Sequence, residues 1–293
     1  MLKGIYAPIP TPFEDGRLSL EHLRHNLAKW EKTRLSGLVV LGSNGEVVLL
    51  EEKEKLLLIE KVREQFPADK PVLAGTGAES TQATISLSQQ AARLGADGVL
   101  VITPSYYKGA MTQPALVRFY TEVADACPVP VVLYNMPRNT GLNLPSAAVI
   151  ELAKHPNIIG IKDSGGNIVQ IAEIIAGTPE DFSVFAGSGS FLFPTLTLGG
   201  TGGTLAVANV IPDLCDDIYQ LTCQGQYEEA RKLQLAILPI NGAVTARYGV
   251  AGLKAALDLL GYFGGPVRGP LTPLPEAPIE EIKTLLRGVK VLP

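Results

Sequence analysis

Short apolar runs alternate with longer amphipathic segments along the 293 residues. The runs are continuous and do not alternate apolar with polar residues, which is typical of parallel strands covered on both faces. The pattern predicts eight strands: Gly4–Ile9, Gly37–Gly42, Pro71–Gly75, Gly98–Thr103, Pro130–Tyr134, Ile158–Lys162, Ser183–Gly187 and Gly203–Val207.

The segments between these runs have helical periodicity. Residues 18–33 place three leucines and Trp30 on one helical face, and similar segments follow the other strands. Eight strand–helix units predict a (β/α)8 TIM barrel over residues 1–225. Residues 226–293 are predicted to be a C-terminal helical extension packed on the barrel or on a partner subunit. A doubly wound sheet is the alternative, but "PTPFEDGRL" after the first strand is no phosphate loop.

Composition narrows the possible partners. Hydrophobic residues make up 46% and charged residues 18%, which suits a large core. The net charge of −4 disfavours nucleic acid, and no run approaches the length of a membrane span. The three cysteines are widely spaced and odd in number, which argues against a disulfide framework. With no secretory signal at the N-terminus, we expect a cytoplasmic protein.

The candidate chemistry lies at the carboxyl ends of the strands, where barrel active sites are built. Lys162 is the only lysine at a strand's end. A low-dielectric surrounding disfavours its charged form, and a neutral amine attacks carbonyl compounds. The alternative is an ion pair between Lys162 and Asp163 or a neighbouring carboxylate. Tyr134 ends the preceding strand, where a phenol can transfer protons during imine formation or pack as a rim tyrosine.

The other strand ends carry small polar residues. The loop "GSNGE" offers Ser43 and Asn44, with glycine-flanked amides suited to a carboxylate, or forms an ordinary turn. None of the histidines ends a strand, so we expect neither histidine catalysis nor a metal site. The predicted substrate-binding residues are Ser43, Asn44, Asn139, Ser164 and Gly187.

Four ordered motifs resemble the dihydrodipicolinate synthase / N-acetylneuraminate lyase family of pyruvate-dependent lyases and aldolases. They are G-x-x-G-E at residues 42–46, T-P-x-Y-Y ending at Tyr107, Y-N-x-P at Tyr134 and G-x-K-D-S at Lys162. The resemblance implies a homotetramer, no cofactor, and a Schiff base between Lys162 and the keto carbon of pyruvate. It also implies that Tyr134 is the acid/base and relays protons through Ser43 to Tyr107 of a neighbouring subunit. Ser43 and Asn44 would hold the pyruvyl carboxylate.

Departures from the family pattern bear on the second substrate, an aldehyde. The synthase pattern has an arginine five residues after the tyrosine, where this chain has Asn139, and Arg138 stands one place early. Sialic-acid lyases carry an Asp-Glu pair where this chain has Gly189 and Ser190.

Further motifs resemble one subgroup of this family, the 4-hydroxy-2-oxoglutarate aldolases. That similarity extends through "NGAVTARYGVAGLK" in the C-terminal helices, where catalysis is expected to impose little. It implies cleavage of 4-hydroxy-2-oxoglutarate to pyruvate and glyoxylate. Two alternatives remain: a 4-hydroxy-tetrahydrodipicolinate synthase that condenses pyruvate with aspartate semialdehyde, and a non-catalytic barrel that binds an oxo acid.

Overall fold

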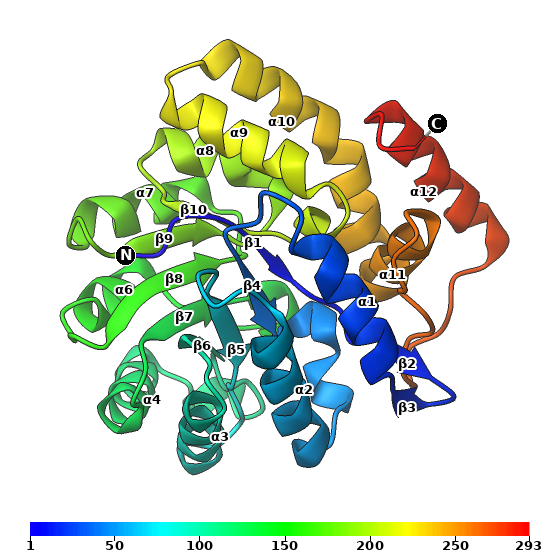
Figure 1. The fold of residues 1–293 in the computed structure, drawn as a ribbon. Helices are drawn as coiled ribbons and strands as arrows, with labels where there is room; N and C mark the ends of the chain where they lie inside the picture. Colours follow the sequence, from blue (N-terminus) through cyan, green and yellow to red (C-terminus); the bar gives the residue numbers. More distant parts are fainter. Residues whose placement is uncertain (293) are drawn as a thin grey trace.

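The computed structural model describes residues 1–292, and within this range eight parallel strands close into a barrel (Figure 1). Each barrel strand pairs with the next along the chain, and the last pairs with the first. This confirms the predicted (β/α)8 barrel. The strands are β1 (Gly4–Pro8), β4 (Gly37–Val40), β5 (Val72–Gly75), β6 (Gly98–Ile102), β7 (Val131–Asn135), β8 (Ile158–Asp163), β9 (Ser183–Ala186) and β10 (Gly202–Thr204).

Helices surround the barrel on its outside (Figure 1). A small hairpin of β2 (Phe13–Glu14) and β3 (Arg17–Leu18) precedes the first of them. The helices of the ring are α1 (Leu20–Trp30), α2 (Glu52–Gln65), α3 (Thr81–Arg93), α4 (Gln113–Ala126), α6 (Ser146–Leu152), α7 (Ile168–Gly177), α8 (Leu192–Thr197) and α9 (Pro212–Cys223). A short helix, α5 (Pro137–Thr140), lies between β7 and α6.

The last barrel strand differs from the prediction. We expected Gly203–Val207, but β10 is Gly202–Thr204, and a 3₁₀ turn at Ala206–Asn209 follows it. A β-carbon at Gly202 would lie 2.0 Å from the carbonyl oxygen of Gly4, so this strand position requires a glycine. Leu205, Ala206 and Val207 follow the strand and are buried as well. Their apolar sequence therefore resembles the continuation of a strand.

Two apolar regions hold the barrel together. The larger one fills the space between the strands and the surrounding helices. The smaller one fills the barrel interior with side chains from six different strands, and polar residues continue the interior at the carboxyl end. Its buried members are Tyr6, Val39, Leu73, Leu100, Val132, Tyr134 and Phe185.

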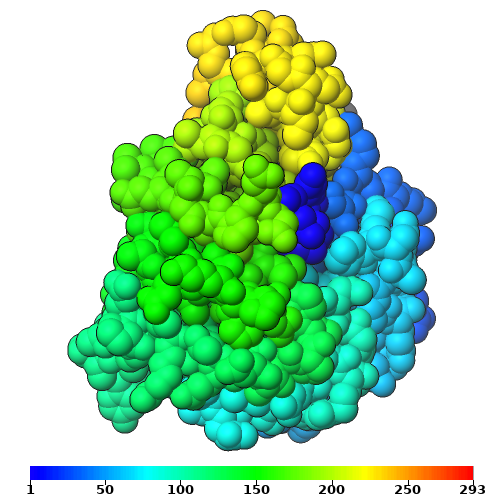
Figure 2. Space-filling view, turned by 90° about the vertical axis from the view of Figure 1, so that its left-hand side faces the viewer, coloured from blue at the N-terminus to red at the C-terminus, as the bar shows by residue number. Residues whose placement is uncertain are grey.

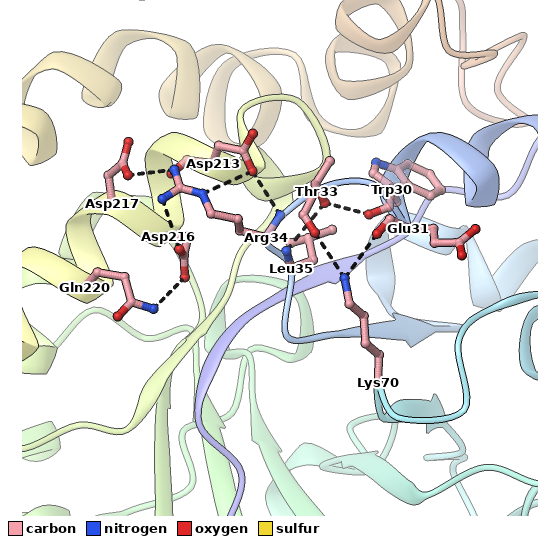
Figure 3. A network of polar contacts seen from close by, with 10 residues as sticks. All are labelled: Trp30, Glu31, Thr33, Arg34, Leu35, Lys70, Asp213, Asp216, Asp217 and Gln220. Carbon is pink, nitrogen blue, oxygen red and sulfur yellow. Dashed lines mark hydrogen bonds and ion pairs between the residues drawn. The ribbon is translucent and has the colours of Figure 1, made fainter.

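An ionic cluster ties the first helix of the ring to the last (Figure 3). Arg34 lies before β4, and its guanidinium contacts the carboxylates of Asp213, Asp216 and Asp217 around α9 at 3.6, 3.4 and 2.6 Å. The nearby ammonium group of Lys70 donates to the carbonyl oxygens of two residues just after α1. Since Arg34 precedes its strand, the cluster lies at the amino end of the barrel, away from the predicted site.

The C-terminal segment is helical. It comprises α10 (Tyr227–Gly242), a π-helical turn at Ala243–Arg247, α11 (Gly249–Leu259) and α12 (Glu276–Gly288). Figure 2 shows α9 and α10, in yellow, forming a projection at one end of the molecule, with the N-terminal residues (blue) at the surface beneath it. The proposed division between barrel and extension at residue 225 falls between these two helices and stays a prediction. Of the helices described, none is long and apolar enough to cross a membrane.

Candidate active site

Lys162 and Tyr134 lie side by side at the carboxyl end of the barrel. Strands β7 and β8 pair with Tyr134 opposite Lys162, which sends both side chains into the barrel interior. Lys162 is 3% exposed, and its Nζ lies 4.2 Å from the centroid of the Tyr134 ring. The sequence therefore places a buried amine against the face of a phenol.

Asp163 is not the partner of Lys162. Successive strand residues point to opposite faces, so the carboxylate leaves the barrel interior. It accepts hydrogen bonds from Asn135 Nδ2 at 2.8 Å, Gln170 Nε2 at 3.2 Å and the Gly165 amide at 2.8 Å. The alternative of a structural ion pair with Asp163 is therefore wrong.

The hydroxyl of Tyr134 faces the loop that follows β4. Its Oη lies 3.3 Å from Ser43 Oγ, in the 3₁₀ turn Ser43–Gly45. Leu41 and Glu46 flank this turn, and both have the left-handed backbone conformation, with φ of 61° and 55°. Such strain in non-glycine residues costs about 1–3 kcal/mol each and is found where the surroundings enforce it.

Glu46 supplies that enforcement. Its carboxylate is buried and pairs with Lys254 Nζ of α11 at 2.6 Å. It also accepts the backbone amide of Arg268 at 2.8 Å, while Thr11 Oγ1 donates to the carbonyl oxygen of Gly45 at 2.7 Å. Burial lowers the pKa of Lys254, against the opposing attraction of Glu46. The C-terminal segment thus holds the loop that carries Ser43.

These groups open into a cavity of about 350 Å³. Arg138 is the charged side chain of its wall, Lys162 is the other basic residue, and its described lining contains no aspartate or glutamate. A wall with this charge suits an anionic ligand. The lining residues are Pro8, Ser43, Asn44, Tyr134, Met136, Arg138, Asn139, Lys162, Ser164, Gly187, Ser188, Ser190, Phe191, Thr204, Ala206, Val244, Thr245, Ala246, Gly249 and Val250.

The structure brings most of the predicted site residues together in this cavity. Asn44, Asn139, Ser164 and Gly187 all line it with Ser43, Tyr134 and Lys162. The glycine at 187 is required, since a β-carbon there would lie 2.6 Å from the backbone carbonyl oxygen of Asp163 as well as 2.0 Å from Ser164 Oγ. Their roles stay predictions, but their placement fits one binding site.

Tyr107 is the predicted residue that does not line the cavity. It is 72% exposed, and its ring packs edge-on against Tyr106 with centroids 5.1 Å apart. Glu79 fixes the loop by accepting the backbone amides of Ser105 and Tyr106 at 2.9 and 2.8 Å. Tyr107 therefore extends outward from its own site, and its proposed part in a neighbouring site stays a prediction.

Arg138 lines the cavity although it stands one position early for the synthase pattern. It lies on α5, and its Nη2 donates to the carbonyl oxygen of Ala246 at 2.8 Å. Asn139 also lines the cavity, so this wall presents both a guanidinium and an amide. The π-helical turn at Ala243–Arg247 provides the carbonyl that anchors the arginine.

The C-terminal segment contributes more to the cavity than its sequence indicates. Five lining residues, from Val244 to Val250, belong to the π-helical turn and α11. The expectation that catalysis imposes little on these helices is wrong as far as the shape of the cavity is concerned. No local pattern predicts this contact, although π-helical turns are frequent at functional sites.

No group of three or more His, Cys, Asp or Glu side chains within residues 1–292 is arranged to hold a metal ion. His22 lies on α1 and stacks on Phe263 with ring centroids 3.5 Å apart. His25 contacts the carbonyl oxygen of Gly261 at 2.9 Å. These two imidazoles thus join α1 to the C-terminal segment at a distance from the cavity.

Known proteins resemble this chain over its whole length. The pattern of the dihydrodipicolinate synthetase family matches residues 1–288. The 4-hydroxy-tetrahydrodipicolinate synthase of Geobacter metallireducens is 36% identical and covers 100% of both chains. That of Methanoculleus marisnigri is 39% identical, over 98% of this chain and 99% of its own. The dihydrodipicolinate synthase structure from Thermotoga maritima superposes with a TM-score of 0.95 at 31% identity, covering 100% of both chains.

Proposed function

The chain belongs to the dihydrodipicolinate synthetase family, and from this premise we propose that Lys162 captures a 2-oxo acid as a Schiff base to cleave 4-hydroxy-2-oxoglutarate. As a member, it is a pyruvate-dependent lyase that forms a Schiff base. The proposal concerns which residues carry the reaction and which aldehyde takes part.

The proposed reaction uses three side chains. The neutral amine of Lys162 attacks C2 of the oxo acid, and Tyr134 supplies the proton with which the carbinolamine loses water. The protonated imine then accepts the electron pair of the C3–C4 bond while the 4-hydroxyl loses its proton, which releases glyoxylate. The resulting enamine takes up a proton at C3, and water hydrolyses the imine to pyruvate and the free amine. The distance of 3.3 Å between Ser43 Oγ and Tyr134 Oη supports proton exchange between these two groups.

One observation carries this proposal. Lys162 is a buried lysine whose cavity, as far as the structure describes it, contains no carboxylate to hold its charge. No ion pair therefore occupies the amine, and it faces the cavity where an oxo acid can reach it. The intact group of Lys162, Tyr134 and Ser43 argues against a barrel that only binds, since binding alone requires no nucleophile.

A second candidate is the synthase reaction with aspartate semialdehyde. The names of the relatives support this candidate better than they support the aldolase. We prefer the aldolase on one departure from the synthase pattern: Asn139 stands where that pattern has its carboxylate-binding arginine, and Arg138 lines the same wall one position earlier. Both reactions start from the same Schiff base, so only the aldehyde distinguishes them.

Reduction with borohydride in the presence of pyruvate tests the shared step. We expect a stable mass increase on the peptide that contains Lys162. The adduct should be lost in Lys162→Arg but kept in Lys53→Arg, a control at a surface lysine whose side chain is 81% exposed. No adduct in the wild-type protein would leave an oxo-acid-binding barrel as the better description.

A coupled assay then identifies the aldehyde. Strong release of glyoxylate from 4-hydroxy-2-oxoglutarate, with weak consumption of aspartate semialdehyde, is the result expected of the aldolase. The opposite ratio would establish the synthase in its place. A homotetramer and a cytoplasmic location are part of the same proposal, and light scattering on the purified protein tests the first of these.

A further inference from the structure

A buried asparagine of the C-terminal segment contacts two hydroxyls of the cavity wall. Ser188 and Ser190 line the cavity in the turn after β9. Asn241, near the end of α10, is 0% exposed, and its Nδ2 donates to Ser190 Oγ at 2.8 Å and to Ser188 Oγ at 3.3 Å. A single amide group thus contacts both serine side chains.

This contact fixes the direction in which the hydroxyls act. A hydroxyl oxygen that accepts from an amide keeps its own proton for another acceptor. Ser188 Oγ accepts a second bond, from the backbone amide of Ser190 at 3.2 Å. Within residues 1–292 no acceptor is found for either hydroxyl proton, and Asn241 Oδ1 has no hydrogen-bond partner. In this arrangement the amide donates to both serine oxygens, and each hydroxyl keeps a proton that it can donate into the cavity.

The charge of the same region indicates what these donors bind. Arg138 lines the cavity and is anchored on the carbonyl oxygen of Ala246, five residues after Asn241 in the chain. Two hydroxyl donors and a guanidinium match the oxygens of a carboxylate, which only accept. A sugar or alcohol hydroxyl would also need an acceptor for its proton.

We propose that Ser188 and Ser190 bind the distal carboxylate of the substrate, and that Asn241 is the positioning residue that keeps both hydroxyls as donors. This subsite rests on the proposed function, because the other end of the substrate is the imine at Lys162. It defines the substrate class as 2-oxo acids with a second carboxylate.

Two oxo acids that form the same imine separate the subsite from the catalytic amine. Pyruvate lacks a distal carboxylate and 2-oxoglutarate has one, and borohydride traps either on Lys162. In Asn241→Asp the new carboxylate accepts both serine protons and repels the ligand. We expect the half-saturating concentration of 2-oxoglutarate to rise roughly 10- to 100-fold, because this is the effect of losing hydrogen bonds to a charged group. The half-saturating concentration of pyruvate should change less than about threefold.

Gln234→Glu is the matched control. Gln234 lies on the same helix and holds the same turn through its backbone, since its Nε2 donates to the Gly189 carbonyl oxygen at 2.6 Å and its Oε1 accepts the Phe193 amide at 2.9 Å. This variant should lose thermal stability but keep the wild-type ratio of the two half-saturating concentrations. An equal change of this ratio in both variants would overturn the proposal. The binding of 2-oxoglutarate would then depend on the position of the turn and not on the serine protons.

The double variant Ser188→Ala/Ser190→Ala keeps the test decisive if Asn241→Asp does not fold. It removes the two hydroxyls without adding a buried charge. It should raise the half-saturating concentration of 2-oxoglutarate by roughly 10-fold or more relative to that of pyruvate. Unchanged trapping of 2-oxoglutarate would refute the subsite while leaving the Schiff base intact. Absence of any pyruvate adduct in the wild type would instead refute the proposed function.

Discussion

Lys254→Met tests whether the C-terminal segment holds the loop that carries Ser43. Both side chains of the ion pair are buried, with 1% of Lys254 and 0% of Glu46 exposed, and their charged atoms lie 2.6 Å apart. Removing one partner of a buried pair leaves an uncompensated charge and costs about 3–5 kcal/mol. At about 2–4 °C per kcal/mol for large domains, the melting temperature should fall by roughly 10 °C.

In the matching variant, Glu46→Gln, we expect the stability of the folded state to increase with pH. An ordinary ion pair of a lysine gives the opposite dependence. Burial already lowers the pKa of Lys254, and Glu46 opposes that shift. Without Glu46 the pKa falls further, so the folded state binds the proton less tightly than the unfolded state. Stability should then increase as pH rises through the folded pKa toward the unfolded value of about 10.4. Melting curves from pH 7 to 10 measure this slope.

The double variant Glu46→Gln/Lys254→Met completes the cycle. It replaces two buried charges with neutral groups of similar size, so it should be more stable than either single variant. Both single variants should also raise the pyruvate concentration that half-saturates borohydride trapping, because the strained turn at Ser43 loses its support. A Lys254→Met protein with wild-type melting and wild-type pyruvate saturation would refute the reasoning.

Three further changes test other contacts. Tyr134→Phe should slow imine formation with pyruvate by roughly 10²–10⁴-fold in quench experiments, and an unchanged rate would remove the phenol from proton transfer. Gly187→Ala should weaken pyruvate trapping at least about 10-fold, because the new β-carbon would lie 2.0 Å from Ser164 Oγ; unchanged saturation would show that the turn can shift freely. The hydrogen bond from Arg268 lowers the pKa of Glu54, so its stabilisation is present above the unfolded pKa and is lost as pH falls through the folded one. The difference in unfolding free energy between wild type and Glu54→Gln, about 1–3 kcal/mol at pH 7, should therefore shrink below about pH 4.5, and a difference independent of pH would contradict this.

The barrel and the pair at its centre could be predicted because their signals are local. Continuous apolar runs mark strands covered on both faces, and a polar residue at the end of such a run lies at the barrel mouth. Tyr134 and Lys162 each end a run, and the parallel pairing of neighbouring strands then places them side by side. The last strand was missed in part because Gly202 and Gly203 pair through their backbones and carry no apolar side chain.

The supports of the site could not be predicted, because they join residues far apart in the chain. Glu46 meets Lys254, and Asn241 meets Ser190, only after the C-terminal helices pack on the barrel. Helical periodicity shows that a face is buried without showing what lies against it. A polar residue such as Asn241 within a helix therefore gives no sign that it borders a cavity.

Two lysines within residues 1–292 are buried in different surroundings, and position in the chain does not show which of them is the nucleophile. Lys162 and Lys254 are 3% and 1% exposed, and each Nζ lies over an aromatic ring, at 4.2 Å from the centroid of Tyr134 and 4.5 Å from that of Phe13. They differ in their counter-ion: Glu46 neutralises Lys254, whereas the cavity around Lys162, within the described residues, contains no carboxylate. A paired ammonium is held by its carboxylate, whereas an amine without such a partner is free to react with a carbonyl compound. Burial alone therefore does not identify the nucleophile. The two lysines are distinguished by their acidic neighbours: Glu46 lies beside Lys254, and the described lining of the cavity at Lys162 contains no acidic residue.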